Sequence, residues 1–108
     1  TWCEPCKEEM PSLDNLQILF NKDEFIVLPI NLDRGPKKKA LSFFDDFNIV
    51  NIETFFDDKN NIPREVKILG LPVTLLINKK GFEVARLIGP TEWTDEKILE
   101  IIRKEISN

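Results

Sequence analysis

The chain has 108 residues, of which 42% are apolar and 31% charged, and this composition is typical of one soluble globular domain. Its formal net charge of -4 argues against a nucleic-acid-binding protein, because such proteins need clustered lysine and arginine. The one basic run, Lys37 to Lys39, is short, and we interpret it as a solvated helix face. No stretch approaches the ~18 apolar residues that are needed to cross a bilayer.

The first half of the chain predicts two helices and two strands. Residues 4–20 are a predicted helix in which Pro11 should produce a kink. The apolar residues of this helix lie near helical spacing, at Met10, Leu13, Leu16 and Phe20. The apolar run 25–33 predicts a buried strand, 36–48 a second helix, and 52–57 a further strand. The inner face of the second helix is predicted to carry Leu41, Phe44 and Phe47.

The second half predicts a short helix over 63–69 and then a hairpin. The hairpin strands are expected over 73–78 and 82–88, with Gly81 supplying the positive φ of the turn.

The last predicted element is a helix over 94–106, capped by Thr94. Its apolar stripe is expected to comprise Ile98, Ile101, Ile102 and Ile106. The order of helices and strands indicates an α/β fold that lacks a strand ahead of the first helix. We therefore expect the full protein to carry that strand upstream of Thr1.

Cys3 and Cys6 are the only two cysteines of the chain. A structural zinc site needs four Cys or His ligands, and haem attachment needs a histidine where Lys7 stands. Two inert buried thiols remain an alternative. However, residues three apart in a helical turn lie about 5–6 Å apart, within the ~4.4–6.8 Å that a disulfide spans. The spacing therefore favours a redox pair, with no metal and no cofactor.

The position of the two thiols predicts their roles. Cys3 would lie at a helix N-terminus, where exposed N–H groups favour a thiolate. Cys6, one turn further on, would attack the mixed disulfide that Cys3 forms. Glu4 disfavours the thiolate and no imidazolium stabilises it, so the pair is predicted to act as a reductant rather than an oxidant.

The motif WCEPCK, followed about 65 residues later by GLPVT, resembles the thioredoxin-like superfamily. The whole chain is similar to the TlpA/ResA-type thiol-disulfide reductases, most of all to the TlpA branch. The stretches that carry this resemblance are WCEPCKEEMPSLDNLQ, INLDR, LGLPVTLLINKKG and IGPTEW. The resemblance implies one thioredoxin-like domain over 1–108, with a mixed central sheet flanked by helices.

The resemblance also implies functional residues. Cys3 would be the nucleophile and Cys6 the resolving thiol of a redox-active disulfide, and Pro72 would be the cis-proline that faces it. The alternative for Pro72 is an ordinary trans proline at the start of a strand. The backbone of Leu71 would pair with an extended client segment. The remaining residues of the client groove would be Trp2, Glu4, Pro5, Gly70, Gly89 and Pro90. For Trp2 the alternative is a core side chain.

Glu9 lies three residues after Cys6 on the same helical face. In related reductases a glutamate at this place lies near the cysteines, so Glu9 is a candidate to take the proton of Cys6. The alternative is a solvated helix residue. Trp93, in the GPTEW stretch, is expected to pack rather than to contact client.

The resemblance implies a protein-disulfide reductase in the periplasm, held at the inner membrane by an N-terminal anchor. Its clients would be cysteine proteins of cytochrome c or cytochrome oxidase maturation, and a membrane thiol relay would supply electrons. A general cytosolic thioredoxin and a non-catalytic metal-binding or chaperone module remain alternatives. A peroxidase fits the cysteine spacing poorly.

Overall fold

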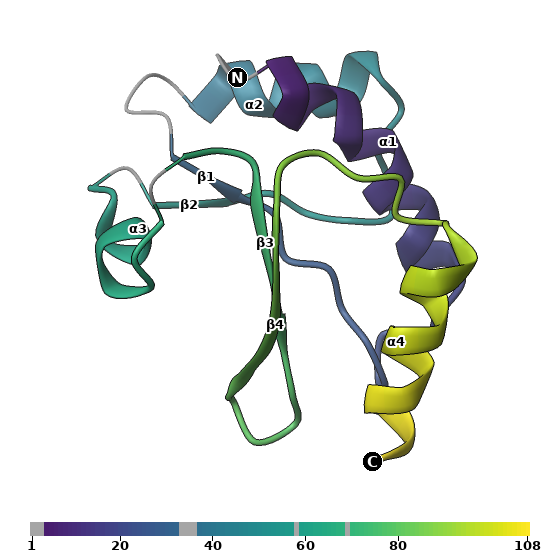
Figure 1. The fold of residues 1–108 in the computed structure, drawn as a ribbon. Coiled ribbons are helices and arrows are strands. Elements are labelled where there is room, and N and C mark those ends of the chain that lie inside the picture. Colours follow the sequence, from purple (N-terminus) through teal and green to yellow (C-terminus); the bar gives the residue numbers. More distant parts are fainter. Residues whose placement is uncertain (1–3, 33–36, 58, 69) are drawn as a thin grey trace.

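The computed structural model describes residues 4–32, 37–57, 59–68 and 70–108. The predictions at Trp2, Cys3 and Pro36 therefore lie outside the described residues. In chain order the elements are α1 (Glu4–Ile18), β1 (Ile30–Asn31), α2 (Lys37–Asp46), β2 (Phe55–Phe56), α3 (Asn61–Glu65), β3 (Val73–Ile77), β4 (Glu83–Ile88) and α4 (Glu96–Ser107). Figure 1 shows their arrangement.

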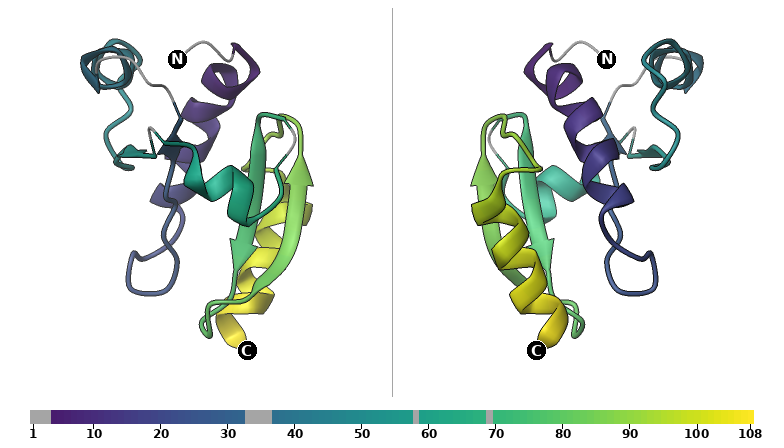
Figure 2. Two further views of the ribbon diagram at one scale, coloured as in Figure 1. Left: turned by 90° about the vertical axis from the view of Figure 1, so that its left-hand side faces the viewer. Right: turned by 90° about the vertical axis from the view of Figure 1, so that its right-hand side faces the viewer.

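The strands form two separate pairs. β1 and β2 are parallel, with Ile30 opposite Phe55, whereas β3 and β4 are antiparallel, with Val73 opposite Ile88. α4 runs alongside the β3–β4 hairpin, and α3 lies near the β1–β2 pair (Figures 1 and 2). The α/β class is confirmed, because parallel and antiparallel strands occur together with helices. The single mixed central sheet that the resemblance implies is not observed, since the strands of the described residues form two separate two-stranded sheets.

The core is built mainly around α1 and α4. Its buried apolar residues are Leu13, Leu16, Ile49, Ile52, Trp93, Leu99 and Ile102. The predicted inner face of α1 is confirmed, because Leu13 and Leu16 are buried and Met10 and Phe20 pack against the cluster. The helix passes through Pro11 without ending.

α1 also carries buried polar side chains that form hydrogen bonds with backbone groups of loops distant in the sequence. The Asp14 carboxylate accepts hydrogen bonds from the backbone and side-chain N–H groups of Asn51, at 2.7 and 3.1 Å. The Gln17 side chain accepts from the Val27 N–H and donates to the Phe25 carbonyl oxygen. These bonds satisfy groups that would otherwise be buried without partners. They fix the loop before β1 and the loop between α2 and β2 to the helix.

Two strand predictions are too long. Of the predicted strand 25–33, only Ile30–Asn31 pairs, and of 52–57 only Phe55–Phe56. The side chains of Ile26 and Leu28 are 54% and 53% exposed, so the expectation of a fully buried strand is wrong within the described residues. A strand needs a neighbouring strand along its length. The backbone of residues 25 and 27 forms hydrogen bonds with the Gln17 side chain and not with a strand.

The short helix begins two residues earlier than predicted, at Asn61, and ends at Glu65. The cause is Asp57, whose carboxylate accepts hydrogen bonds from the N–H groups of Asn61 and Ile62. A carboxylate at this end of a helix satisfies the free N–H groups and suits the helix dipole.

The buried face of α2 is rotated relative to the prediction. Ala40 is buried and Phe44 packs against the core as predicted, but Leu41 and Phe47 are 55% and 57% exposed. Phe43 takes the inner position instead. Phe47 contacts the Phe43 ring on the helix surface, with 4.6 Å between the ring centroids.

The hairpin prediction is confirmed, with β3 and β4 joined by a turn in which Gly81 has φ 90°. The side-chain oxygen of Asn78 stabilises this turn by accepting hydrogen bonds from the N–H groups of Lys80 and Phe82.

α4 is capped by Asp95 and not by Thr94, because the Asp95 side chain accepts the N–H of Lys97 at 2.9 Å. The predicted apolar stripe is confirmed at Ile102 and at Ile98 and Ile106, which pack against the core. Leu99 and Ile102 are buried, whereas the predicted Ile101 is 52% exposed.

Candidate active site

Cys6 lies in the first turns of α1 with a half-buried side chain. It is disulfide-bonded. Its predicted partner, Cys3, lies outside the described residues, so the pairing of Cys3 with Cys6 stays a prediction. Glu4 and Pro5 are exposed, and the Glu4 carboxylate forms an ion pair with Lys7 at 3.2 Å.

Glu9 is buried one turn beyond Cys6, with only 5% of the residue exposed. Its Oε2 accepts two hydrogen bonds, from the Thr91 N–H and from the Trp93 indole N–H, both at 3.0 Å. The interpretation of Glu9 as a solvated residue is therefore wrong. Burial raises the pKa of the Glu9 carboxyl, and the hydrogen bonds from Trp93 and Thr91 offset this only in part.

Trp93 packs in the core, as expected, and is 7% exposed. Its backbone N–H donates to the Ser12 hydroxyl at 2.7 Å, so α1 holds the segment after β4 at two helix positions, Glu9 and Ser12. Sequence reasoning missed Ser12 and Thr91. The usable signal was the spacing of Glu9 and Ser12, which places two polar residues on one helical face.

Pro72 lies at the start of β3 and follows a cis peptide bond from Leu71, so the trans alternative is wrong. The Pro72 carbonyl oxygen accepts the N–H of Gly89 at 2.9 Å, and Gly89 has φ 96°, a conformation that glycine adopts readily. Gly89 is thus brought next to Pro72. Gly70 and Pro90 are exposed.

One groove connects these positions. It is mainly apolar, has a volume of about 920 Å³, and is lined by Cys6, Glu9, Leu71 and Pro72 among others. The Glu9 carboxylate accepts a hydrogen bond from the Thr91 N–H. Two residues earlier in the same loop, the Gly89 N–H donates to the Pro72 carbonyl oxygen. These hydrogen bonds link the first turns of α1 to the start of β3, and both elements line the same groove. Glu4, Pro5, Gly70, Gly89 and Pro90 do not line it.

No protein-family model matches the chain. Among curated proteins, the chain is 30% identical over 105 residues to sporulation thiol-disulfide oxidoreductase A of Bacillus subtilis, covering 89% of the chain and 62% of that protein. It is 32% identical over 89 residues to the thiol-disulfide oxidoreductase ResA of Bacillus subtilis, covering 82% of the chain and 49% of ResA. A solved structure from Chlorobium tepidum, assigned as a thiol:disulfide interchange protein DsbE, matches with a TM-score of 0.80 and 26% identity over 97% of the chain and 73% of that structure. The chain is a distant homologue of the ResA/StoA/DsbE-type thiol-disulfide oxidoreductases, at about 30% identity over most of its length.

The fold of the chain is thioredoxin-like. A second structural match supports this, since StoA of Bacillus subtilis superposes with a TM-score of 0.76 at 21% identity, over 99% of the chain and 75% of that structure. The chain spans about half to three fifths of the length of the first curated relatives, namely 62%, 47% and 59%.

The described residues contain neither a candidate metal site nor a candidate membrane span. In the part of the chain that the structure describes, no group of three or more His, Cys, Asp or Glu side chains is placed to hold a metal ion. None of the helices over the described ranges has the length and apolarity that a membrane crossing requires.

Proposed function

We propose that this chain is the catalytic domain of a protein-disulfide reductase in which Cys3 and Cys6 cycle between dithiol and disulfide. The observation that carries the proposal is the placement of a half-buried, disulfide-bonded Cys6 on the same groove as Leu71 and Pro72. A groove lined by a half-buried cysteine with a backbone segment beside it suits an extended client disulfide. Homology to thiol-disulfide oxidoreductases supports the same chemistry.

In the proposed reaction the Cys3 thiolate attacks one sulfur of the client disulfide, and the other client sulfur leaves and takes a proton from solvent. The Cys6 thiol then loses its proton and attacks the Cys3 sulfur of the mixed disulfide. The first client sulfur leaves in turn and is protonated. Two electrons thus pass from the protein dithiol to the client, which gains two thiols as the protein gains one disulfide. A dithiol relay restores the reduced protein.

Glu9 is the proposed acceptor of the Cys6 proton. It lies one helical turn from Cys6, and burial raises its pKa toward neutrality, where a carboxylate is a more effective base. Both hydrogen bonds fall on Oε2, so Oε1 is the oxygen we assign to proton transfer.

We also propose the cellular setting that the resemblance implies. The protein would act in the bacterial periplasm at the inner membrane and keep client cysteines reduced during cytochrome c or cytochrome oxidase maturation. A membrane thiol relay would supply its electrons.

The proposal predicts that Cys6→Ser in the full-length protein traps clients on Cys3. With the resolving thiol removed, the mixed disulfide has no intramolecular route to release, so covalent adducts should accumulate in the native envelope. Non-reducing electrophoresis and mass spectrometry of the adducts would detect them and name the clients.

The matched control is the double variant Cys3→Ser, Cys6→Ser, which lacks both thiols of the pair and should form no adduct through them. If Cys6→Ser forms no adducts and the wild-type protein also fails to reduce a model disulfide, the proposed function is wrong. Tight stoichiometric binding of copper or zinc by the reduced protein, without disulfide exchange, would point instead to a metal-binding module.

The apolar groove also supports the proposal that a further strand, from outside the 108 residues, completes the sheet. Beyond Leu71 and Pro72, the groove is lined by the stretches 22–32 and 73–79, and among the described residues β3 pairs with β4 alone. In the described part of the chain, no backbone hydrogen bond involves Ile26 or Leu28. Such an unpaired strand edge is a template for another strand.

Hydrogen exchange of the full-length protein tests this strand. The amides of Ile26 and Leu28 should exchange about a thousandfold or more slowly than those of an unstructured peptide, because the added strand accepts them. The amide of Val50, whose residue is 80% exposed in a loop, should exchange fast and serves as the control. Fast exchange at Ile26 and Leu28 would show that the groove holds no strand.

A further inference from the structure

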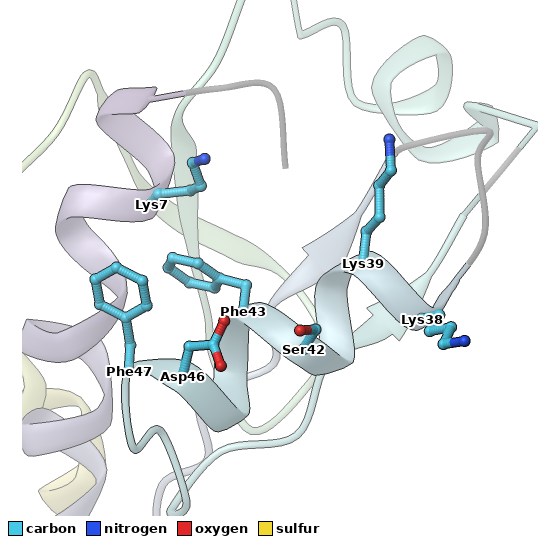
Figure 3. Close-up of a pocket in the computed structure, with 7 residues that line it drawn as sticks. All are labelled: Lys7, Lys38, Lys39, Ser42, Phe43, Asp46 and Phe47. Carbon is cyan, nitrogen blue, oxygen red and sulfur yellow. The ribbon is translucent and has the colours of Figure 1, made fainter.

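A second groove lies between the start of α1 and α2 (Figure 3). Its volume is about 590 Å³, and the residues that line it are Lys7, Lys38, Lys39, Ser42, Phe43, Asp46 and Phe47. Lys7 directly follows Cys6 in the chain, so this groove begins beside the proposed redox centre. Cys6 itself faces the other groove.

The floor of the groove near Lys7 is aromatic. The rings of Phe43 and Phe47 are in contact, with centroids 4.6 Å apart, and Phe47 is 57% exposed. The Lys7 ammonium lies 5.9 Å from the centroid of the Phe43 ring, within cation–π range. The half-buried Phe43 ring and the largely exposed Phe47 ring together form an apolar surface that the fold covers only in part.

The rim of the groove is basic although the chain as a whole is acidic, with net charge -4. Lys38 and Lys39 are exposed at the first turn of α2, and among the described residues no ion pair involves either of them. Among the described residues that line the groove, Asp46 is the one acidic side chain, and it lies toward the Phe47 end of α2 (Figure 3). The Lys7 ammonium is already paired with Glu4. The unpaired positive charge is therefore at the Lys38–Lys39 end.

We propose that this groove binds an acidic segment of the client polypeptide that flanks the client cysteine. Acidic side chains of the segment contact Lys38 and Lys39, and an apolar side chain covers Phe43 and Phe47. Lys7 marks the end at which the segment passes to the redox centre. This inference rests on the proposed function, because it names the class of client that the reductase prefers. Sequence alone favours a solvated lysine run, since the pattern does not reveal the exposed aromatic pair beside it.

Binding of an unreactive peptide tests the groove independently of catalysis. The probe is a fluorescent peptide with two serines in place of cysteines, flanked by glutamates and one phenylalanine, and the comparison is a peptide with lysines in place of the glutamates. The full-length protein should bind the acidic peptide more tightly in fluorescence anisotropy. The double variant Lys38→Glu, Lys39→Glu should bind it about tenfold more weakly at low salt. Near 1 M salt, where the screening length is ~3 Å, the difference should largely disappear.

The matched control is Lys97→Glu, Lys104→Glu, which makes the same change of charge on two exposed lysines of α4. It should leave the preference for the acidic peptide intact. Equal loss in both double variants would mean that only the net charge matters and would overturn the proposal. Equal binding of the two peptides by the wild-type protein would also overturn it.

Reduction of the matching disulfide peptides separates this inference from the proposed function. If the wild-type protein reduces both peptides equally well, the reductase stands and the groove proposal fails. If it binds the acidic peptide but reduces neither, the groove stands and the proposed function fails. If the Lys38 and Lys39 substitutions abolish binding to anionic phosphatidylserine vesicles but leave peptide binding unchanged, the basic rim is a membrane surface and the proposal is wrong.

Discussion

Replacing Cys3 by serine is expected to lower the rate of client disulfide reduction by about a thousandfold or more. Only a thiolate attacks a disulfide at a useful rate, and a serine hydroxyl remains protonated at neutral pH. Cys6 cannot substitute, because its position one turn into α1 is half-buried, whereas Cys3 would precede the helix. The measurement is the single-turnover rate with a fluorescent disulfide peptide and prereduced full-length protein.

The comparison with Cys6→Ser sharpens this result. That variant keeps the attacking thiol, so it should consume one equivalent of peptide in a fast first step and then stop at the mixed disulfide. Cys3→Ser should show no fast step at all. If Cys3→Ser retained the burst and Cys6→Ser lost it, the roles of the two thiols would be reversed. Full activity in both variants would remove the cysteine pair from the mechanism.

The parts of the fold that depend on local patterns could be predicted from the sequence. The hairpin follows from two runs of β-forming residues around Lys79, Lys80 and Gly81, and the structure places both strands within a residue or two of the prediction. α1 and α4 also appear where apolar spacing places them. Such elements carry their own signal, because periodicity and turn residues act over a few positions.

The parts that depend on distant partners could not be predicted. The length of β1 depends on how far β2 runs beside it. It also depends on Gln17 of α1, whose side chain forms hydrogen bonds with the backbone of residues 25 and 27. The helix at Asn61 starts early because Asp57 happens to reach its first N–H groups. A single sequence does not show which side chain will find such a partner.

The candidate site divides in the same way. The cysteine motif and Pro72 can be recognised in the sequence, and the resemblance correctly implies the cis peptide bond before Pro72. The burial of Glu9 is not visible, because its partners Thr91 and Trp93 are 82 and 84 residues away in the chain. Among neighbouring glutamates, only the fold distinguishes the buried Glu9 from the exposed Glu8.

Substituting alanine for Glu9 is expected to lower the free energy of unfolding by about 2–4 kcal/mol, because the Thr91 N–H and the Trp93 indole N–H both lose their acceptor. The exposed neighbour offers a control, since Glu8→Ala should change stability by less than about 0.5 kcal/mol. Urea unfolding of the full-length variants, followed by Trp fluorescence, measures both. A Glu9→Ala protein as stable as Glu8→Ala would show that water replaces the lost carboxylate at no cost.

Glu9→Gln separates the hydrogen bonds from the charge. Both bonds fall on Oε2, so the single amide oxygen of glutamine can accept both, and this variant should stay close to the wild type in acid. The pKa of Glu9 is raised in the folded protein above its ordinary value of 4.5. Folded wild type therefore holds the proton more tightly, and its stability should fall as the pH rises from about 4.5 through the raised pKa. Glu9→Gln has no proton to lose and should lack that part of the fall. If the two proteins lose stability in parallel over this range, the Glu9 carboxyl titrates as an ordinary carboxyl, and the physical basis for using it as the base for Cys6 is gone.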